Sequence, residues 1–123
     1  MILRVLIVDD YEPFLEAASA LLRQEGVEVV GVASTSEETI WRAAQLQPDV
    51  VLVDIMLGPE SGVDLTRRLD EEGWLDGGAV ILTSTHVEAD LVDLIADTPA
   101  IGFLPKAELS ADAIRRMVNA HRR

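Results

Sequence analysis

The feature that most constrains the fold is a regular alternation of short apolar runs with longer amphipathic segments. Five runs have the length and the β-branched content of buried strands; they span residues 3–8, 27–33, 50–54, 79–84 and 101–105. The segments between them place apolar residues at the three- and four-residue spacing of a helix. We expect these helices at residues 13–25, between a cap at Ser34 and Pro48, around 63–69, at 86–97, and after a cap at Ser110.

Strands that alternate with helices predict a single α/β domain over residues 1–123, with a parallel sheet covered by helices on both faces. Right-handed crossovers leave few topologies, and the flavodoxin-like (βα)5 arrangement is common at this chain length. We therefore expect a doubly wound sheet with the strand order 2-1-3-4-5. Ser34 and Glu37 are expected to form a capping box for the second helix.

Three aspartates directly follow two of the predicted strands. Asp9 and Asp10 end the first strand, and Asp54 ends the third. In the expected order these strands are neighbours, and the winding of the sheet reverses between them, so their carboxyl ends form the crevice in which such folds bind ligands. Carboxylates can gather around a hard cation, and oxygen ligands alone suit Mg²⁺. Asp10 considered alone is better explained as a cap of the first helix.

Polar side chains also follow the fourth and fifth strands. The fourth strand ends in the hydroxyls of Thr83, Ser84 and Thr85, and Lys106 follows the fifth. The three oxygens of a transferred phosphoryl group need a metal ion, a hydrogen-bond donor and a cation. Aspartate can itself be the nucleophile and form an aspartyl phosphate. The strand ends together therefore predict a site for a phosphoryl group.

With these residues in place, the whole chain resembles the receiver domain of bacterial two-component response regulators. The stretch "LIVDD" resembles the acidic pair that holds Mg²⁺, and "VVLVD" resembles the strand that ends in the phosphoacceptor, here Asp54. In "VDIMLGPESG", Met56 stands where a backbone carbonyl of the family completes the metal site. The resemblance thus implies that Asp9, Asp10, Asp54 and Met56 are the metal ligands, with Mn²⁺ as a substitute for Mg²⁺.

The stretches "VILTS" and "GFLPK" resemble the switch segments of the same family. They imply a switch hydroxyl at Thr83, a switch aromatic at Phe103 and a phosphate-pairing lysine at Lys106. Ser84 is a second candidate for the hydroxyl, and Thr85 stands where the family tunes the lifetime of the phosphorylated state. Two loops depart from the family pattern without removing a reactive side chain. Proline precedes the lysine instead of following it, and glycine replaces proline in the loop after the phosphoacceptor.

The resemblance implies a phosphorylation-dependent signalling switch, not an enzyme that turns over an external substrate. Asp54 would receive its phosphoryl group from a sensor histidine kinase or a phosphotransfer protein. The signal would leave through the face formed by helix 86–97, strand 101–105 and the last helix, a face that the family also uses for homodimers. We expect the chain to hold the receiver domain alone, with no output domain.

Three alternatives would use the same residues differently. A phosphohydrolase with an aspartyl nucleophile needs two aspartates separated by one residue on the first strand, whereas Asp9 and Asp10 are adjacent. A flavin-binding module of the same strand order needs a first loop rich in Ser, Thr and Gly to bind a phosphate, which two carboxylates would repel. A receiver-like interaction module that works without phosphorylation stays open.

Composition limits the partners and the location of the chain. The 22 acidic residues outnumber the 10 basic ones and give a net charge of -12. We expect no nucleic-acid binding by this chain, because such affinity comes mainly from Lys and Arg that neutralise phosphates. The absence of cysteine excludes thiol catalysis and cysteine-ligated metals. We recognise no signal peptide and no apolar run of membrane-spanning length, so we expect a cytoplasmic protein without a membrane partner.

Overall fold

The computed structural model of the chain describes residues 2–74, 78–85, 93 and 95–121. The long strands are β1 (Arg4–Val8), β2 (Glu28–Ala33), β3 (Val50–Asp54), β6 (Ala79–Ser84) and β7 (Gly102–Pro105). The helices are α1 (Glu12–Gln24), α2 (Ser36–Leu46), α3 (Gly62–Glu71) and α5 (Ala111–His121). Two short strands, β4 (Met56–Leu57) and β5 (Glu60–Ser61), and a 3-10 turn, η1 (Lys106–Glu108), complete the described elements.

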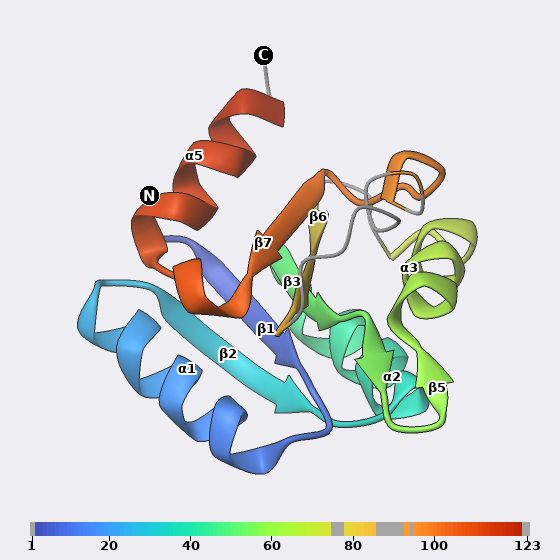
Figure 1. Cartoon of the computed structure of the whole chain (residues 1–123), viewed down its shortest axis with the longest axis horizontal. Helices are drawn as coiled ribbons and strands as arrows, with labels where there is room; N and C mark the ends of the chain where they lie inside the picture. Colours follow the sequence, from blue (N-terminus) through green and yellow to red (C-terminus); the bar gives the residue numbers. More distant parts are fainter. Residues whose placement is uncertain (1, 75–77, 86–92, 94, 122–123) are drawn as a thin grey trace.

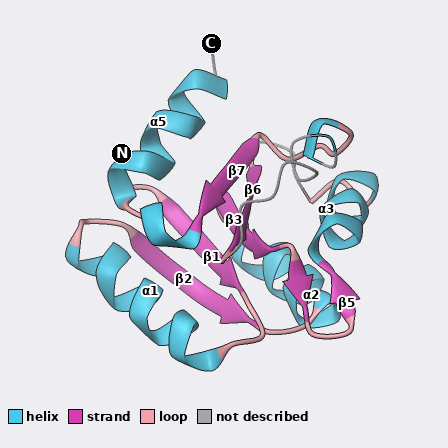
Figure 2. Ribbon diagram, in the orientation of Figure 1, coloured by secondary structure: helices cyan, strands magenta, loops and turns pink. Residues whose placement is uncertain are grey.

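The five long strands form one parallel sheet in the order β2-β1-β3-β6-β7. This confirms the predicted order 2-1-3-4-5, because β6 and β7 are the fourth and fifth long strands along the chain. The central position of β3 explains its apolar residues 50–53, since a strand buried on both faces needs apolar side chains on both of them. Figures 1 and 2 show the sheet between its helices.

Two hydrophobic clusters cover the two faces of the sheet. The first cluster joins α1 and α5 to one face; its largest contributors include Val5, Ile7, Leu22, Leu52, Ile81, Leu104 and Ile114. The second cluster joins α2 and α3 to the other face; its members include Leu6, Val8, Ala43, Val53, Leu65, Leu69 and Leu82. Figure 1 shows α1 and α5 on one side of the sheet and α2 and α3 on the other. The doubly wound arrangement is therefore confirmed.

The start of α2 corrects the predicted capping box by one residue. The N-cap is Thr35, whose Oγ1 accepts a hydrogen bond of 3.2 Å from the Glu38 N–H. The Ser34 N–H in turn donates to Glu38 Oε1 at 2.8 Å. The pairing of Ser34 with Glu37 is wrong because the chain stays extended through Thr35, so the helix begins only at Ser36.

The start of α1 corrects the reading of Asp10 as a helix cap. The N-cap is Tyr11, and no side chain caps this helix. The Tyr11 N–H instead donates to Asp9 Oδ1 at 2.9 Å, so the first aspartate anchors the chain as it leaves β1. At the last helix the predicted cap is confirmed, because Ser110 Oγ accepts a hydrogen bond of 3.0 Å from the Ala113 N–H.

The loop after β3 contains an element that the sequence analysis did not predict. It folds back as an antiparallel hairpin of β4 and β5, with Gly58 at a φ of 58° in the turn. The predicted helix 86–97 lies mostly outside the described residues. Within this range, the described residues Asp93, Ile95 and Ala96 are helical. No helix among the described residues is both long and apolar enough to cross a membrane.

Candidate functional site

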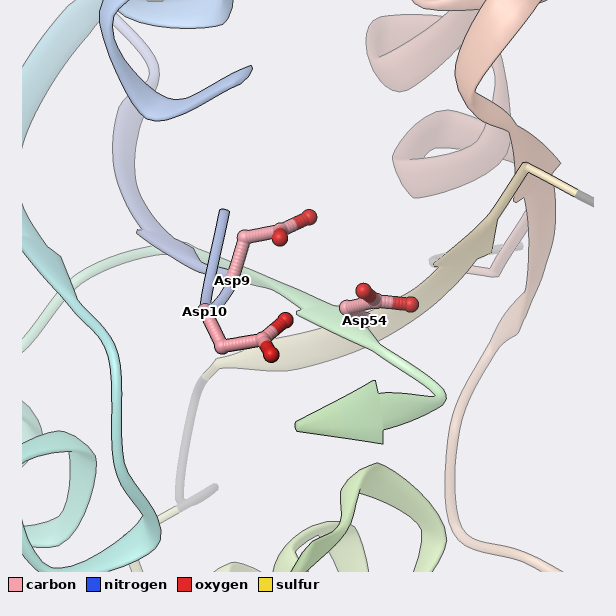
Figure 3. Close-up of side chains that lie close together, drawn as sticks. All are labelled: Asp9, Asp10 and Asp54. Carbon is pink, nitrogen blue, oxygen red and sulfur yellow. The ribbon is translucent and has the colours of Figure 1, made fainter. Parts of the chain in front are cut away.

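Three carboxylates meet at the carboxyl edge of the sheet. Asp9 and Asp10 follow β1 and Asp54 ends β3, and the two strands are direct neighbours. One oxygen of each carboxylate lies within 4.8 Å of the others. Asp9 is fully buried, Asp54 is buried and Asp10 is exposed, so the group reaches from the interior to the surface. Figure 3 shows the three side chains gathered at this edge. The predicted acidic group is thus brought together by the strand order.

The alternation of side chains along the strands decides which hydroxyl shares this face. Val50 and Leu52 point to the face of the sheet covered by the first cluster. Because side chains alternate along a strand, Asp54 points to the same face. Asp54 pairs with Thr83 across β3 and β6, and paired residues on neighbouring parallel strands point to the same face. Ser84 points to the same face as Leu82, which is the face covered by the second cluster. Thr83 is therefore the hydroxyl on the aspartate side of the sheet.

Lys106 brings a positive charge to the acidic group. Its Nζ lies 2.5 Å from Asp9 Oδ2 and 3.3 Å from Asp54 Oδ2. The lysine stands in the 3-10 turn that follows Pro105 at the end of β7. Only 11% of its side chain is exposed, so the ammonium has exchanged most of its water for the two carboxylates. This contact joins residues far apart in the sequence and confirms that the end of β7 faces the ends of β1 and β3.

The electrostatics of the site disfavour a charged Asp54. Burial raises the pKa of the Asp54 carboxyl above its ordinary value of 3.8, and the Asp9 carboxylate raises this pKa further. Lys106 and the Met56 N–H, which lies 3.3 Å from Asp54 Oδ1, lower the pKa without cancelling the increase. The pKa stays raised because the two carboxylates repel each other in a buried site where water does little to stabilise their charges. An additional cation would relieve the repulsion.

The donors at this edge fit a magnesium ion. All three side chains offer carboxylate oxygens, which are the ligands that hard divalent cations prefer. Asp9 Oδ1 is held by the Tyr11 N–H, whereas Oδ2 accepts no hydrogen bond within the described part of the chain and has only its ion pair with Lys106. The Met56 N–H donates to Asp54 Oδ1, so the backbone of Met56 borders the cluster, although the residue as a whole is 68% exposed.

The remaining predicted residues lie away from the carboxylates. Phe103 pairs with Leu82 and packs against the second cluster, on the opposite face from Thr83. Ser84 is buried on that same face, and Thr85 is exposed just beyond the strand. The structure thus brings Thr83 and Lys106 to the acidic site and leaves Phe103 on the other side of the sheet.

Two residues that touch the site were missed in the sequence analysis. The ring of Phe14, on the first turn of α1, lies 4.3 Å from Lys106 Nζ. Gly62 opens α3 so close to β3 that a Cβ there would lie 2.0 Å from the Asp54 carbonyl oxygen. Phe14 looked like an ordinary member of the apolar face of a helix. For Gly62 the sequence did offer a signal. It follows Ser61, a residue type that often caps helices, and a glycine at the first position of a helix allows another backbone to approach closely.

Comparisons with known proteins agree with this geometry. The family model for the response regulator receiver domain matches residues 5–119. The transcriptional regulatory protein LiaR of Bacillus subtilis is 32% identical over 117 residues, which cover 92% of this chain and 54% of LiaR. The response regulator protein VraR of Staphylococcus aureus is 30% identical over 120 residues, covering 94% of this chain and 56% of VraR. The chain therefore spans about half the length of the curated relatives it matches.

Solved structures show the same fold. The signal receiver domain of a modulated diguanylate cyclase from Desulfovibrio desulfuricans G20 superposes with a TM-score of 0.79 at 29% identity, covering 98% of this chain and 93% of that one. The response regulator domain of Thermotoga maritima CheB gives a TM-score of 0.80 at 23% identity, covering 97% of this chain and 98% of that one, which is a likeness of fold alone. With a family match over nearly its whole length, the chain belongs to the response regulator receiver domain family.

Proposed function

We propose that this receiver domain is a phosphorylation-dependent signalling switch in which Asp54 accepts the phosphoryl group. The observation that carries the proposal is the position of Asp54 between two other carboxylates and a lysine. Oxygens of Asp9, Asp10 and Asp54 lie within 4.8 Å of one another, and Lys106 Nζ lies 3.3 Å from Asp54 Oδ2. A carboxylate nucleophile, a hard-cation site and a positive side chain are the parts that phosphoryl transfer to an aspartate requires.

The metal ligands in this proposal are Asp9, Asp10, Asp54 and the Met56 carbonyl, which would hold Mg²⁺ or Mn²⁺. A bound divalent ion supplies charge neutralisation for the phosphoryl oxygens. The residues of the chain position the reactants. An oxygen of Asp54 forms the new bond to phosphorus while the bond from phosphorus to the donor's imidazole nitrogen breaks. Lys106 pairs with one phosphoryl oxygen.

Thr83 and Phe103 are the proposed switch residues. Thr83 shares the face of Asp54, so its hydroxyl is placed to donate a hydrogen bond to a second phosphoryl oxygen. Phe103 lies on the other face of the sheet, where it packs against the second cluster. Coupling between the two would therefore pass through the paired strands β6 and β7, and it would bias two packings of Phe103. Ser84, the last residue of β6, and Thr85, which follows it, are proposed to tune the lifetime of the phosphorylated state.

The proposed phosphoryl donor is a phosphohistidine on a sensor histidine kinase or a phosphotransfer protein, and the proposed location of this chain is the cytoplasm. The proposed output surface is formed by residues 86–97, β7 and α5, and it also offers a place for a homodimer. LiaR is named as a transcriptional regulatory protein, which supports an output in gene regulation for a longer protein that contains this receiver. The receiver itself carries a net charge of -12 and is not proposed to contact nucleic acid.

Intact mass measured after incubation with acetyl phosphate and Mg²⁺ tests this function. We expect one added phosphoryl group on the native chain, none on Asp54→Asn, and one on the matched control Asp64→Asn, which removes an exposed carboxylate from the first turn of α3. Addition to all three proteins would refute the assignment of Asp54.

Phosphate-release and Mg²⁺-binding measurements beside this experiment separate the alternatives. A phosphohydrolase would release phosphate over many turnovers from an external phosphomonoester, whereas a receiver releases at most what it has accepted. A module that works without phosphorylation would bind Mg²⁺ and gain no mass from acetyl phosphate or from a phosphorylated kinase. Either result would replace the proposed switch with that alternative.

A further inference from the structure

The environment of Lys106 contains a contact that the proposed mechanism does not use. Its ammonium pairs with oxygens of Asp9 and Asp54 and also lies over the ring of Phe14, 4.3 Å from the ring centroid. A cation at that distance from an aromatic ring is attracted by the negative face of the ring. A flexible lysine side chain is thus held by two kinds of contact, ion pairs and an aromatic ring.

Phe14 is itself fixed to the acidic site through the backbone of the α1 start. The Asp9 Oδ1 atom accepts from the Tyr11 N–H at 2.9 Å, and the Tyr11 carbonyl accepts from the Phe14 N–H at 3.1 Å. The Phe14 ring then contacts Lys106, and Lys106 pairs with Asp9 Oδ2. These contacts form a closed loop that begins and ends at Asp9. Phe14 also packs against the first cluster, which limits its rotation.

We propose that Phe14 is a positioning residue that holds the Lys106 ammonium at the place where it must meet the phosphoryl group. This inference rests on the proposed function. Lysine loses more side-chain entropy on ordering than most residues, so an ammonium without a second support would spread over several positions. The ring restricts this motion, keeps water from one side of the ammonium and adds no competing negative charge.

Two variants of Phe14 separate its aromatic ring from its volume. Phe14→Leu keeps an apolar side chain and removes the ring, and Phe14→Tyr keeps the ring. We expect Phe14→Leu to slow phosphorylation by acetyl phosphate about 3- to 10-fold, and Phe14→Tyr to stay within about 2-fold of the native rate. Leu22→Val, two turns further along α1 in the same cluster, controls for lost packing. It should lower the melting temperature and leave the rate unchanged.

A spectroscopic readout tests the contact between Lys106 and the Phe14 ring independently of phosphorylation. Lys106 is the single lysine of the chain, so a sample labelled with ¹³C-lysine gives one set of side-chain signals. We expect the methylene protons next to Nζ to be shifted by the ring current of Phe14. The shift should persist in Phe14→Tyr and Leu22→Val and disappear in Phe14→Leu, whereas the affinity for Mg²⁺ should change less than about 2-fold in all of them.

The outcomes are distinct. The proposal holds if the slow rate and the lost shift occur together in Phe14→Leu alone, and if Phe14→Leu has no further effect on the rate in a Lys106→Met background. Equal slowing by Leu22→Val, or unchanged lysine signals in Phe14→Leu, would overturn it. If the native chain accepts no phosphoryl group, the proposed function fails, and the lysine signals alone then decide whether the Phe14 ring contacts Lys106.

Discussion

Replacing Gly62 by alanine tests the packing that places Asp54. A Cβ at this position would lie 2.0 Å from the Asp54 carbonyl oxygen, 2.8 Å from its carbonyl carbon and 3.0 Å from Ile55 Cα. All three are backbone atoms, so no side chain can rotate away. The start of α3 and the end of β3 would have to separate by about 1 Å or more before the contact became tolerable.

The magnitude of the Gly62→Ala effect follows from three contributions. Overpacking of this kind costs about 1–3 kcal/mol. The separation also weakens the 2.8 Å hydrogen bond from the Gly62 N–H to the Ile55 carbonyl, which contributes about 1 kcal/mol. Alanine favours a helix over glycine by up to about 1 kcal/mol in the opposite direction. We therefore expect a net loss of about 1–3 kcal/mol in the free energy of unfolding, although helix propensity alone predicts a gain.

Denaturant unfolding and the rate of phosphorylation by acetyl phosphate measure the two consequences of Gly62→Ala. The matched control is Gly73→Ala, because Gly73 has a φ of 79° and its added Cβ would meet nothing within 4 Å. The control should lose about 1 kcal/mol through backbone strain and keep the native rate. Gly62→Ala should lose both stability and rate, since the Asp54 backbone moves. Native stability in Gly62→Ala, or a native rate, would refute the reasoning.

Three further predictions concern the charges of the site. In the folded protein the pKa of Asp54 lies above its ordinary value of 3.8, so the folded chain binds a proton on this carboxyl more tightly than the unfolded chain does. The protein therefore loses stability as the pH rises from 3.8 through the pKa of the folded state. In metal-free buffer Asp54→Asn should therefore melt above the native chain at pH 7, with the difference shrinking as the pH falls toward 3.8; a constant difference in calorimetric scans would contradict this. Lys106→Met leaves the buried Asp9 carboxylate without its cation and should cost about 3 kcal/mol in metal-free buffer, with saturating Mg²⁺ restoring much of the loss in denaturant titrations; equal Mg²⁺ stabilisation of the variant and the native chain would count against it. Mg²⁺ should raise the melting temperature of the native chain and raise it less in Asp10→Asn, whereas an equal rise in both would exclude Asp10 as a ligand.

The features that could be predicted from sequence follow from topology. A strand buried on both faces forms a continuous apolar run, and the bounds of β3 and β6 were predicted to the residue from such runs and the polar residues that end them. The strand order then places the ends of β1 and β3 side by side, which brings Asp9 and Asp54 together without knowledge of any side-chain position. The acidic group and the facing Lys106 were therefore accessible before the structure.

The features that could not be predicted depend on contacts between distant segments. Nothing local distinguishes Phe14 from other apolar residues of α1, because its contact with Lys106 depends on how the 3-10 turn after β7 meets the first turn of that helix. The choice between Thr83 and Ser84 needed the register of β6 against β3. The capping box was misplaced because one further residue, Thr35, stays extended.

Location of the phosphoryl group on the chain tests the central claim most directly. The native protein would be incubated with acetyl phosphate and Mg²⁺, the acyl phosphate reduced with borohydride, and the tryptic peptide of residues 43–67 fragmented in a mass spectrometer. This peptide contains Asp54 together with Asp49, Glu60 and Asp64 as internal controls. We expect reduction at Asp54 alone, and only when Mg²⁺ was present during phosphorylation. Reduction at another carboxylate, or a phosphorylation that proceeds equally well without a divalent ion, would contradict it.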